Sequence, residues 1–344
     1  MAYSTIDDPS AHFQPIAYTG NGSSRSVTND GNSDLQPDWL WFKKRNDAKA
    51  HVFNDTNRGI TKSIYPNETT VEGTESAGLS SVNSDGFSLG SEDRFNGSSQ
   101  TYVCWQWKVN GGTTSTNSDG TVNTTMQLNA TAGISIITWT GNGSNTGTVG
   151  HGLGAIPDCI IVKNREATQN WSVAFPKFET SKLLALNLDS SFFSASGLSS
   201  YNTSTFVDGS GSSSEDYIAY CFKNIKGYSR FGFFVGTGNA NGPMVYTGFE
   251  PNFVMIKESG ANTNDWFIYD GMRDYQGNAI DKVIKANTNA AESTGRADID
   301  LLSNGFKMRA THADTNRDGG AFVYLAFAKH PWVTSDGTVN TAVV

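Results

Sequence analysis

Three ordered sequence marks recur along the chain, and this internal repeat constrains the fold more than any other feature. The first mark is an aromatic residue followed by TGNG, at 18–22 and 139–143, with the variant VGTGNANG at 235–242. The second is a proline that leads into an apolar run: PDWLWFK (37–43), PDCIIVK (157–163) and PNFVMIK (251–257). The third is an aromatic closing run: TYVCWQWK (101–108), DYIAYCFK (216–223) and AFVYLAFA (321–328). The marks keep one order and similar spacing, so the chain holds three copies of one unit.

Within each copy, short apolar runs rich in β-branched and aromatic residues alternate with turn signals every ~8–12 residues, which is typical of sandwiches. Only 17% of the residues are charged, and Gly, Ser, Thr and Asn are abundant, which argues against helical bundles. We therefore predict an all-β chain. Its expected architecture is three tandem jelly-roll or lectin-like β-sandwich repeats with short linkers and an N-terminal arm.

The marks also predict domain boundaries. The heptapeptide SDGTVNT occurs at 118–124 and again at 335–341, each time a little beyond a closing strand, and looks like a connector between repeats. The expected divisions are an arm that is a candidate anchor (1–16), repeat 1 (17–110), a polar linker (111–132), repeat 2 (133–227), repeat 3 (228–332) and a polar tail (333–344).

Charge and cysteine content exclude several classes of function. The formal charge of −8 leaves no basic stripe to neutralise phosphates, so we expect no nucleic-acid partner. Cys104, Cys159 and Cys221 form no CxxC pair and lie in apolar runs, which favours buried thiols. The chain has neither a long apolar stretch nor a basic, apolar leader at its start, so we expect cytoplasmic synthesis without membrane insertion.

No motif for catalysis stands out, and we expect no enzyme. None of the five histidines lies in a zinc or hydrolase motif. Carboxylates that could cleave glycans occur in repeat 1 (Asp55, Glu68, Glu72 and Glu75). Repeat 3 has carboxylates at some of the corresponding positions, Asp270 and Glu292, which favours a structural role shared by the two repeats.

Two Asp-x-x-Arg pairs are the most distinctive charged marks: Asp55 with Arg58, and Asp270 with Arg273. An Arg fork beside a carboxylate could bind a sugar acid or a partner's carboxylate, which makes these four residues candidate binding residues. The alternative is a salt-bridge clamp that pins the loop after the central strand. The presence of the pair in both repeat 1 and repeat 3 favours the clamp. Repeat 2 has no Asp-x-x-Arg pair at the corresponding place.

The stretch DTNRDG (314–319) matches the opening half of a calcium loop, with Asp314, Asn316 and Asp318 as candidate ligands. Position twelve would be Leu325 instead of glutamate. An ordinary turn is therefore favoured over a calcium site, and no other cofactor is expected.

Aromatic residues could stack on sugar rings, but their places in the repeat favour core packing. Trp39 and Trp41 alternate along one strand and share a face, as do Trp105 and Trp107. We expect these four indoles to be buried.

The blocks YSTIDDPSAHFQPIAYTGNG, NDGNSDLQPDWLWFKKR, TVGHGLGAIPDCIIVKNR and GGAFVYLAFAKHPW resemble a repeat family in structural proteins of tailed phages, especially marine phages of cyanobacteria. The resemblance covers nearly the whole chain. It implies a virion component and carries no catalytic or ligand residues.

This resemblance implies a protein on the virion surface whose partners are other virion proteins. The favoured role is a tail-associated fibre, spike or adaptor adhesin that contacts host surface glycans. The alternative is a capsid decoration or head-fibre protein without receptor binding. No collagen-like, heptad or β-helix repeat could build a long shaft, so a short symmetric homo-oligomer, with a trimer favoured, is expected.

Overall fold

One strand order occurs three times in the computed structural model, which describes residues 3–194, 197–210, 212–260, 262–274 and 277–339. In unit 1 (13–107) the main sheet runs β1 (Phe13–Thr19), β9 (Thr101–Trp107), β3 (Trp39–Lys44), β4 (Val52–Asp55). In unit 2 (115–222) the order is β12 (Ile134–Asn142), β20 (Ser213–Phe222), β14 (Cys159–Asn164), β15 (Ser172–Phe175). In unit 3 (229–331) it is β21 (Ser229–Val235), β28 (Ala321–Pro331), β23 (Phe249–Glu258), β24 (Trp266–Asp270).

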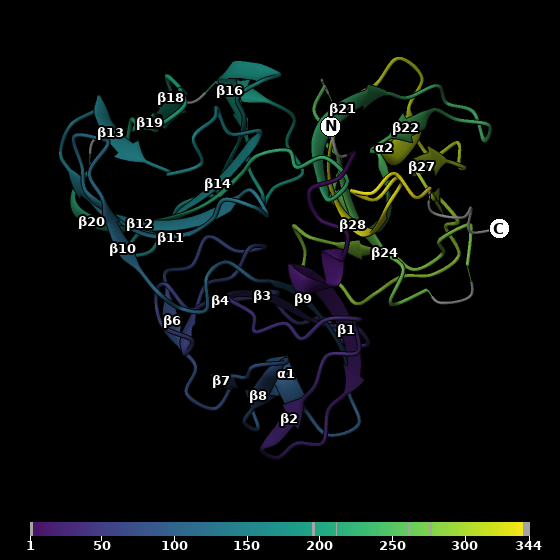
Figure 1. Cartoon of the computed structure of the whole chain (residues 1–344), viewed down its shortest axis with the longest axis horizontal. Helices are drawn as coiled ribbons and strands as arrows, with labels where there is room; N and C mark the ends of the chain where they lie inside the picture. The colour runs from purple at the N-terminus through teal and green to yellow at the C-terminus, as the bar shows by residue number, and fades with distance from the viewer. Residues whose placement is uncertain (1–2, 195–196, 211, 261, 275–276, 340–344) are drawn as a thin grey trace.

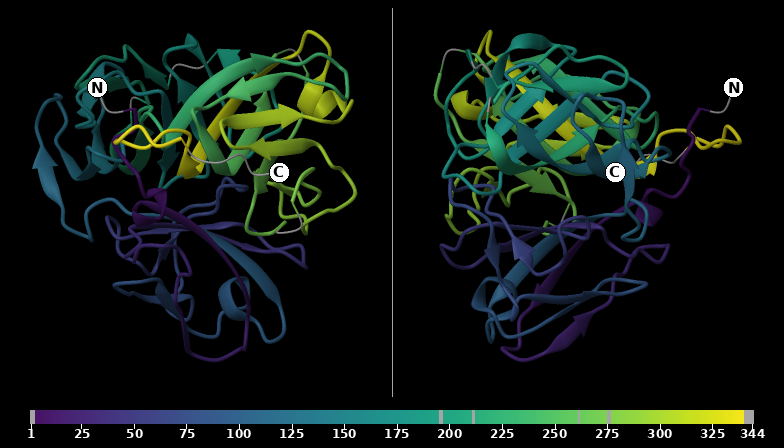
Figure 2. Two further views of the ribbon diagram at one scale, coloured as in Figure 1. Left: turned by 45° about the vertical axis from the view of Figure 1, so that its right-hand side comes forward. Right: turned by 90° about the vertical axis from the view of Figure 1, so that its left-hand side faces the viewer.

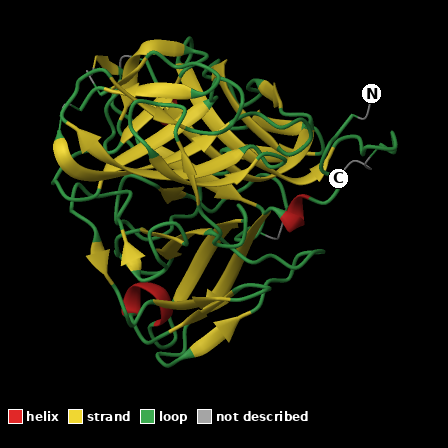
Figure 3. Cartoon of the chain, turned by 60° about the vertical axis from the view of Figure 1, so that its left-hand side comes forward, coloured by secondary structure: helices red, strands yellow, loops and turns green. Residues whose placement is uncertain are grey.

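A small three-stranded sheet faces each main sheet, and it too repeats. The three small sheets are β2 (Arg25–Val27), β8 (Phe87–Leu89), β7 (Leu79–Val82); β13 (Gly147–Gly150), β19 (Thr205–Asp208), β18 (Leu198–Ser199); and β22 (Met244–Tyr246), β27 (Gly305–Met308), β26 (Ile299–Leu302). A separate apolar core fills the space between the two sheets of each unit. The result is an all-β, sandwich-like architecture (Figure 3).

The remaining elements extend the sheets or cap their turns. The additional strands are β5 (Lys62–Ser63), β6 (Gly73–Thr74), β10 (Ser115–Asn117), β11 (Thr124–Asn129), β16 (Glu179–Leu184), β17 (Phe193–Ser194) and β25 (Ile284–Lys285). The helical turns in the described residues are η1 (Pro9–Ala11), α1 (Asp93–Asn96) and α2 (Ala313–Asn316).

A fourth core lies where the three units meet. The faces of the main sheets that point away from the small sheets pack together into one apolar cluster with residues from all three units. Figures 1 and 2 show the units as three lobes around this centre: unit 1 in purple and blue, unit 2 in teal, unit 3 in green and yellow. The main sheets are therefore buried on both faces.

This double burial explains the uninterrupted apolar runs after the repeat prolines. In β3 the side chains of Trp39 and Trp41 enter the shared core, whereas Leu40 and Phe42 enter the core of unit 1. Trp39 stacks on Tyr220 of unit 2, with ring centroids 4.5 Å apart. The prediction that the strand tryptophans are core residues is confirmed, although the core they fill belongs to the whole chain.

Each unit donates a ring N–H to a backbone carbonyl of its neighbour, in cyclic order. The indole of Trp171 in unit 2 donates to the carbonyl of Tyr65 in unit 1, at 3.0 Å. Trp266 of unit 3 donates in the same way to Ala185 of unit 2, at 2.9 Å. At the matching place in unit 1, His51 Nε2 lies 3.1 Å from the carbonyl oxygen of Lys285 in unit 3. The three contacts close a ring, and we call its interfaces seams 1–2, 2–3 and 3–1.

The lysine that ends each repeat's proline mark also crosses a seam. Buried Lys43, Lys163 and Lys257 donate from Nζ to backbone carbonyl oxygens of Asn289, Thr69 and Asp189, each in a neighbouring unit. Burial lowers the pKa of each lysine to about 8. At neutral pH the ammonium is therefore present to satisfy several buried carbonyls at once.

Two segments differ from the sequence-based boundaries. Residues 111–132, expected to be a polar linker, contain β10 and β11, and β11 pairs with β12 along the edge of unit 2. Val122, Met126 and Leu128 are partly buried and pack against the unit 2 core. These few apolar side chains are enough to attach the segment to unit 2. The expected arm 1–16 overlaps β1, which begins at Phe13, and Ser4 of the arm donates to the carbonyl of Lys226 in the connection between units 2 and 3.

The shared core predicts that the full chain unfolds as one body. Separating any unit would expose the apolar face of a main sheet, so we expect one heat-capacity peak and one urea transition. A fragment spanning 111–227 should lack a cooperative transition and bind a hydrophobic dye. Three resolved calorimetric peaks, or a fragment that unfolds cooperatively, would contradict the prediction.

Candidate functional site

The two Asp-x-x-Arg pairs lie at the ends of equivalent strands, β4 and β24, where the chain turns. Asp55 accepts from the backbone N–H of Arg58 at 2.9 Å and pairs with its guanidinium at 2.6 Å. Asp270 binds Arg273 in the same way, at 2.8 and 2.6 Å. All four side chains are 0% exposed.

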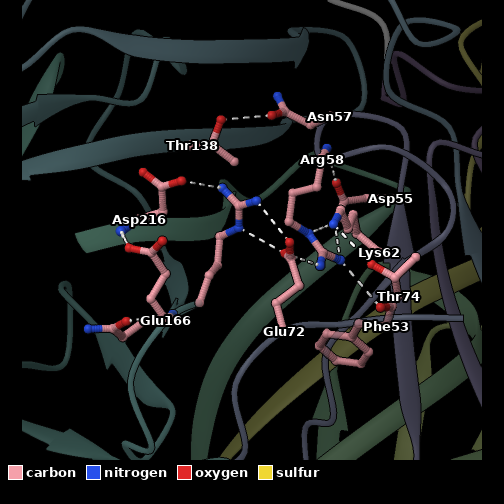
Figure 4. Close-up of polar contacts among 12 residues, drawn as sticks. Phe53, Asp55, Asn57, Arg58, Lys62, Glu72, Thr74, Thr138, Glu166 and Asp216 are labelled. Carbon is pink, nitrogen blue, oxygen red and sulfur yellow. Dashed lines mark hydrogen bonds and ion pairs between the residues drawn. The ribbon is translucent and has the colours of Figure 1, made fainter. Parts of the chain in front are cut away.

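A glutamate completes each pair and reaches across a seam. Glu72 accepts from Arg58 at 2.9 Å (Figure 4). It also accepts from Arg165 of unit 2 at 2.8 Å. Glu292 accepts from Arg273 at 3.0 Å and from Arg45 of unit 1 at 2.8 Å. Each glutamate thus bridges two arginines of different units. We call these residue sets the charged clamps of seams 1–2 and 3–1.

An aromatic donor from the neighbouring unit covers the inner aspartate of each clamp. The hydroxyl of Tyr220 in unit 2 donates to Asp55 at 2.8 Å. The indole N–H of Trp105 in unit 1 donates to Asp270 at 2.9 Å. Tyr220 and Trp105 occupy equivalent positions, because they pair with Ile161 and Trp41 of the central strands. These donors leave the buried carboxylates well satisfied.

Seam 2–3 replaces the whole clamp with apolar or small residues. The strand register places Phe175 at the position of Asp55 and Asp270, and Phe178 follows at the arginine position. The complete set at this seam is Phe175, Phe178 and Phe192 in unit 2 with Ser259 and Leu325 in unit 3. The backbone contact survives: the N–H of Phe192 donates to the carbonyl of Ser259, as Glu72 does to Arg165 and Glu292 to Arg45. The missing Asp-x-x-Arg mark of repeat 2 is therefore one part of a coordinated replacement.

Electrostatics keep the bridging glutamates and Arg58 charged. Burial raises the pKa of Glu72, but hydrogen bonds from Arg165 and Arg58 outweigh it and leave the pKa below 4.5. The pKa of Glu292 is lowered in the same way by Arg45 and Arg273. For Arg58, burial lowers the pKa and the attraction of Asp55 more than reverses that effect.

This geometry leaves the candidate binding residues no room for a ligand. The Asp55, Arg58, Asp270 and Arg273 side chains are fully buried, and their polar atoms bind one another or the neighbouring unit. A sugar acid in solution does not reach them. The structure instead uses both pairs as clamps, which lock units together as well as the local loop.

The residues across each seam were not singled out from the sequence. Arg45 and Arg165 stand at the same offset after the repeat lysine, in KKR (43–45) and KNR (163–165), whereas repeat 3 has KES (257–259). The arginine is thus present in repeats 1 and 2, whereas Asp-x-x-Arg is present in repeats 1 and 3. Each Asp-x-x-Arg pair is therefore followed, in the next unit of the ring, by an arginine after the lysine. Reading the repeats as a closed ring would have connected the two patterns.

The half calcium loop is a structural turn. Asp314 in α2 pairs with Arg296 at 2.6 Å. The buried Asn316 amide donates to the carbonyls of Asn239 and Ala310, and its oxygen accepts from the N–H of Thr237. Asn96 in α1 makes the matching contacts in unit 1, to Asn21 and Gly90. The residues of 314–319 therefore hold the TGNG-type loop, and no cluster of metal-ligating side chains occurs in the described part of the chain.

His51 and the three cysteines have pKa values shifted by burial, and their side chains pack inside the protein. His51 accepts at Nδ1 from the Trp41 indole at 2.8 Å, and burial lowers its pKa well below the usual value. Cys104, Cys159 and Cys221 are buried free thiols, and burial raises the pKa of each. These groups stay neutral and out of solvent contact. Among the described residues, the helices are too short to span a bilayer.

Removing the bridging carboxylate should destabilise the fold strongly. Glu72→Gln leaves the buried Arg58 and nearby Arg165 without their shared counter-charge, and we expect the free energy of unfolding to fall by about 3 kcal/mol. Urea unfolding followed by tryptophan fluorescence measures the loss. The matched control is Glu68→Gln in the same loop, whose carboxylate contacts the Thr70 hydroxyl and which should change little. Equal effects of both substitutions would contradict the clamp.

The clamps also predict acid sensitivity. The pKa values of Glu72 and Glu292 lie below 4.5 in the folded chain, so the folded state binds fewer protons than the unfolded state near that pH. Their stabilisation is complete above about pH 4.5 and is lost as the pH falls through the lowered values. Unfolding free energies measured from pH 7 to 3 should fall more steeply for the natural chain than for the Glu72→Gln/Glu292→Gln double variant. Identical slopes would show that the clamps do not titrate.

Comparison with known proteins adds a family but no activity. No curated protein and no solved structure matches the chain. A family model described as a domain of unknown function, DUF7483, matches residues 8–331. This match begins within the N-terminal arm and ends with the last residue of β28, so it spans all three units and every seam. The chain belongs to the DUF7483 family.

Proposed function

We propose that this protein is a structural component of a virion surface, and that it is a tail-associated adhesin which contacts host glycans. The resemblance of its sequence blocks to structural proteins of tailed phages supports this role. We propose further that each unit is a jelly-roll or lectin-like sandwich, which the repeated pair of facing sheets supports. The alternative remains capsid decoration without receptor binding.

The observation that carries the proposal is the closed ring of three units joined by a shared core and buried contacts. Its most distinctive charged residues lie inside the seams, where they hold units together. Such a body suits display on a particle that must withstand mechanical and chemical stress. It also supports a binding or structural role over an enzymatic one.

The TGNG-type loops are the proposed glycan-contacting surface. Asn21, Asn142 and Asn239 are exposed at equivalent places, one per unit, and side-chain amides are suitable partners for sugar hydroxyls. Asn96 and Asn316 fix two of these loops from beneath. Three similar loops on one rigid body would bind a repeating surface polysaccharide with increased avidity.

Locating and counting the protein on intact particles by electron cryomicroscopy tests the role. A handful of copies on the tail is the expected result, together with binding of the purified chain to host cells. Asn142→Ala should weaken that binding, and Asn57→Ala, at a seam, serves as the matched amide control. Hundreds of copies on the capsid without cell binding would establish decoration, and absence from particles would overturn a virion role.

A further inference from the structure

Unit 3 has an exposed sheet edge that is covered in unit 2. Strand β21 pairs only with β28, and β22 pairs only with β27, so both are edge strands in the described structure. Met244 and Tyr246 on β22 are 41% and 52% exposed, and Phe233 and Val235 on β21 are also exposed. A cleft of about 400 Å³ lies beside Arg230 and Tyr246. Tyr3 of the N-terminal arm bonds the Tyr246 hydroxyl, but the backbone of β22 has no second strand partner in the described structure. A partly exposed, apolar edge of this kind is a template for another strand.

In unit 2 the first SDGTVNT segment covers the equivalent edge. The N–H of Val122 donates to the carbonyl of Thr148 at 3.0 Å, and Val122 forms a parallel bridge with Val149 of β13. Thr121 and Thr148 exchange two hydrogen bonds between backbone N–H and side-chain hydroxyl, each 2.9 Å long. A side chain at Gly120 would clash with the Thr148 carbonyl, so the segment fits tightly against β13.

The second SDGTVNT segment has the same sequence, but its described part, 335–339, contacts no sheet edge; its Ser335 binds Asp7 of the N-terminal arm through its backbone N–H and its hydroxyl. Val339, the counterpart of Val122, is 56% exposed, and within the described residues its backbone forms a bridge with Val333 in a local hairpin. Gly337, the counterpart of Gly120, has no atom within 4 Å of the place where a Cβ would lie. Of the two unit edges that lack a connector, that of unit 1 carries Ser26 and Thr19, whereas that of unit 3 carries exposed apolar side chains.

We propose that residues 335–339 of one chain dock on β22 of a second copy, as 118–122 dock on β13 within the chain. Strand register makes Met244 the counterpart of Thr148 and Val245 that of Val149. Thr338 therefore lies beside Met244, and Val339 beside Val245. Each chain offers one segment and one edge, so the contact is heterologous and builds a closed ring of chains or an open filament. This inference stands whether or not the protein is part of a virion.

The first test is the mass of the full chain in solution. Light scattering after size-exclusion chromatography should give a concentration-dependent multiple of 37.0 kDa. Val339→Asp and Met244→Asp should each return the mass to that of one chain. Ile156→Asp, at an exposed apolar residue of unit 2, is the matched control and should keep the larger mass. A single-chain mass for the natural protein at all concentrations, or loss of association in the control alone, would overturn the proposal.

The second test identifies the occupant. Chains carrying Thr338→Cys are mixed with chains carrying Met244→Cys under mild oxidation; the native cysteines are buried and do not interfere. A disulfide-linked pair that forms only in the mixture is the expected result. A disulfide closed within one chain of the double variant would show that the tail covers its own edge, and a pair formed by Thr338→Cys chains alone would show tail-to-tail contact. Either outcome, or no cross-link, overturns the proposal.

Discussion

Burial of the main sheets on both faces is the constraint on which the rest of the structure depends. Each sheet has one face against its own small sheet and the other against two neighbouring main sheets. The inner faces carry the largest side chains of the protein, including Trp39, Trp105 and Trp107. The hydrophobic free energy of this shared core exists only when all three units are assembled. The repeats are therefore parts of one folding body, although each has a core of its own.

The seams show two solutions to one packing problem. Seams 1–2 and 3–1 bury an Asp–Arg–Glu–Arg set with an aromatic donor. At the equivalent positions seam 2–3 has Phe175, Phe178, Phe192, Ser259 and Leu325, and Phe178 is 40% exposed. Replacing a buried ion network by apolar residues of similar volume is often nearly neutral, whereas removing one member leaves an uncompensated charge. The cost of removing one member alone explains why seam 2–3 differs from the other two seams at all five clamp positions. The backbone hydrogen bond common to all three seams keeps the geometry while the side chains differ.

Much of the fold could be predicted from the sequence, and most of the site could not. The repeat marks located the central and closing strands well; TYVCWQWK, for example, became β9 (Thr101–Trp107). The segment expected as a linker contains β11, whose apolar side chains Met126 and Leu128 are only partly buried, so few apolar residues are needed and the stretch reads as polar. The Asp-x-x-Arg pairs stand out in the sequence. Their partners Arg45 and Arg165 were missed because contacts across a closed ring have no local signature in the sequence.

Joining three units in one chain also changes what a single substitution can do. In a ring of three identical subunits, every change at an interface is repeated three times, so replacing Asp by Phe would remove all the ion pairs at once. In this chain the residues of each seam occupy different positions of one sequence, so a substitution changes one seam alone. Seam 2–3 has no charged residue at the clamp positions, whereas the other two seams have charged clamps, and all three seams belong to one closed ring. Because the three units share one chain, the three interfaces of this nearly symmetric body can differ from one another.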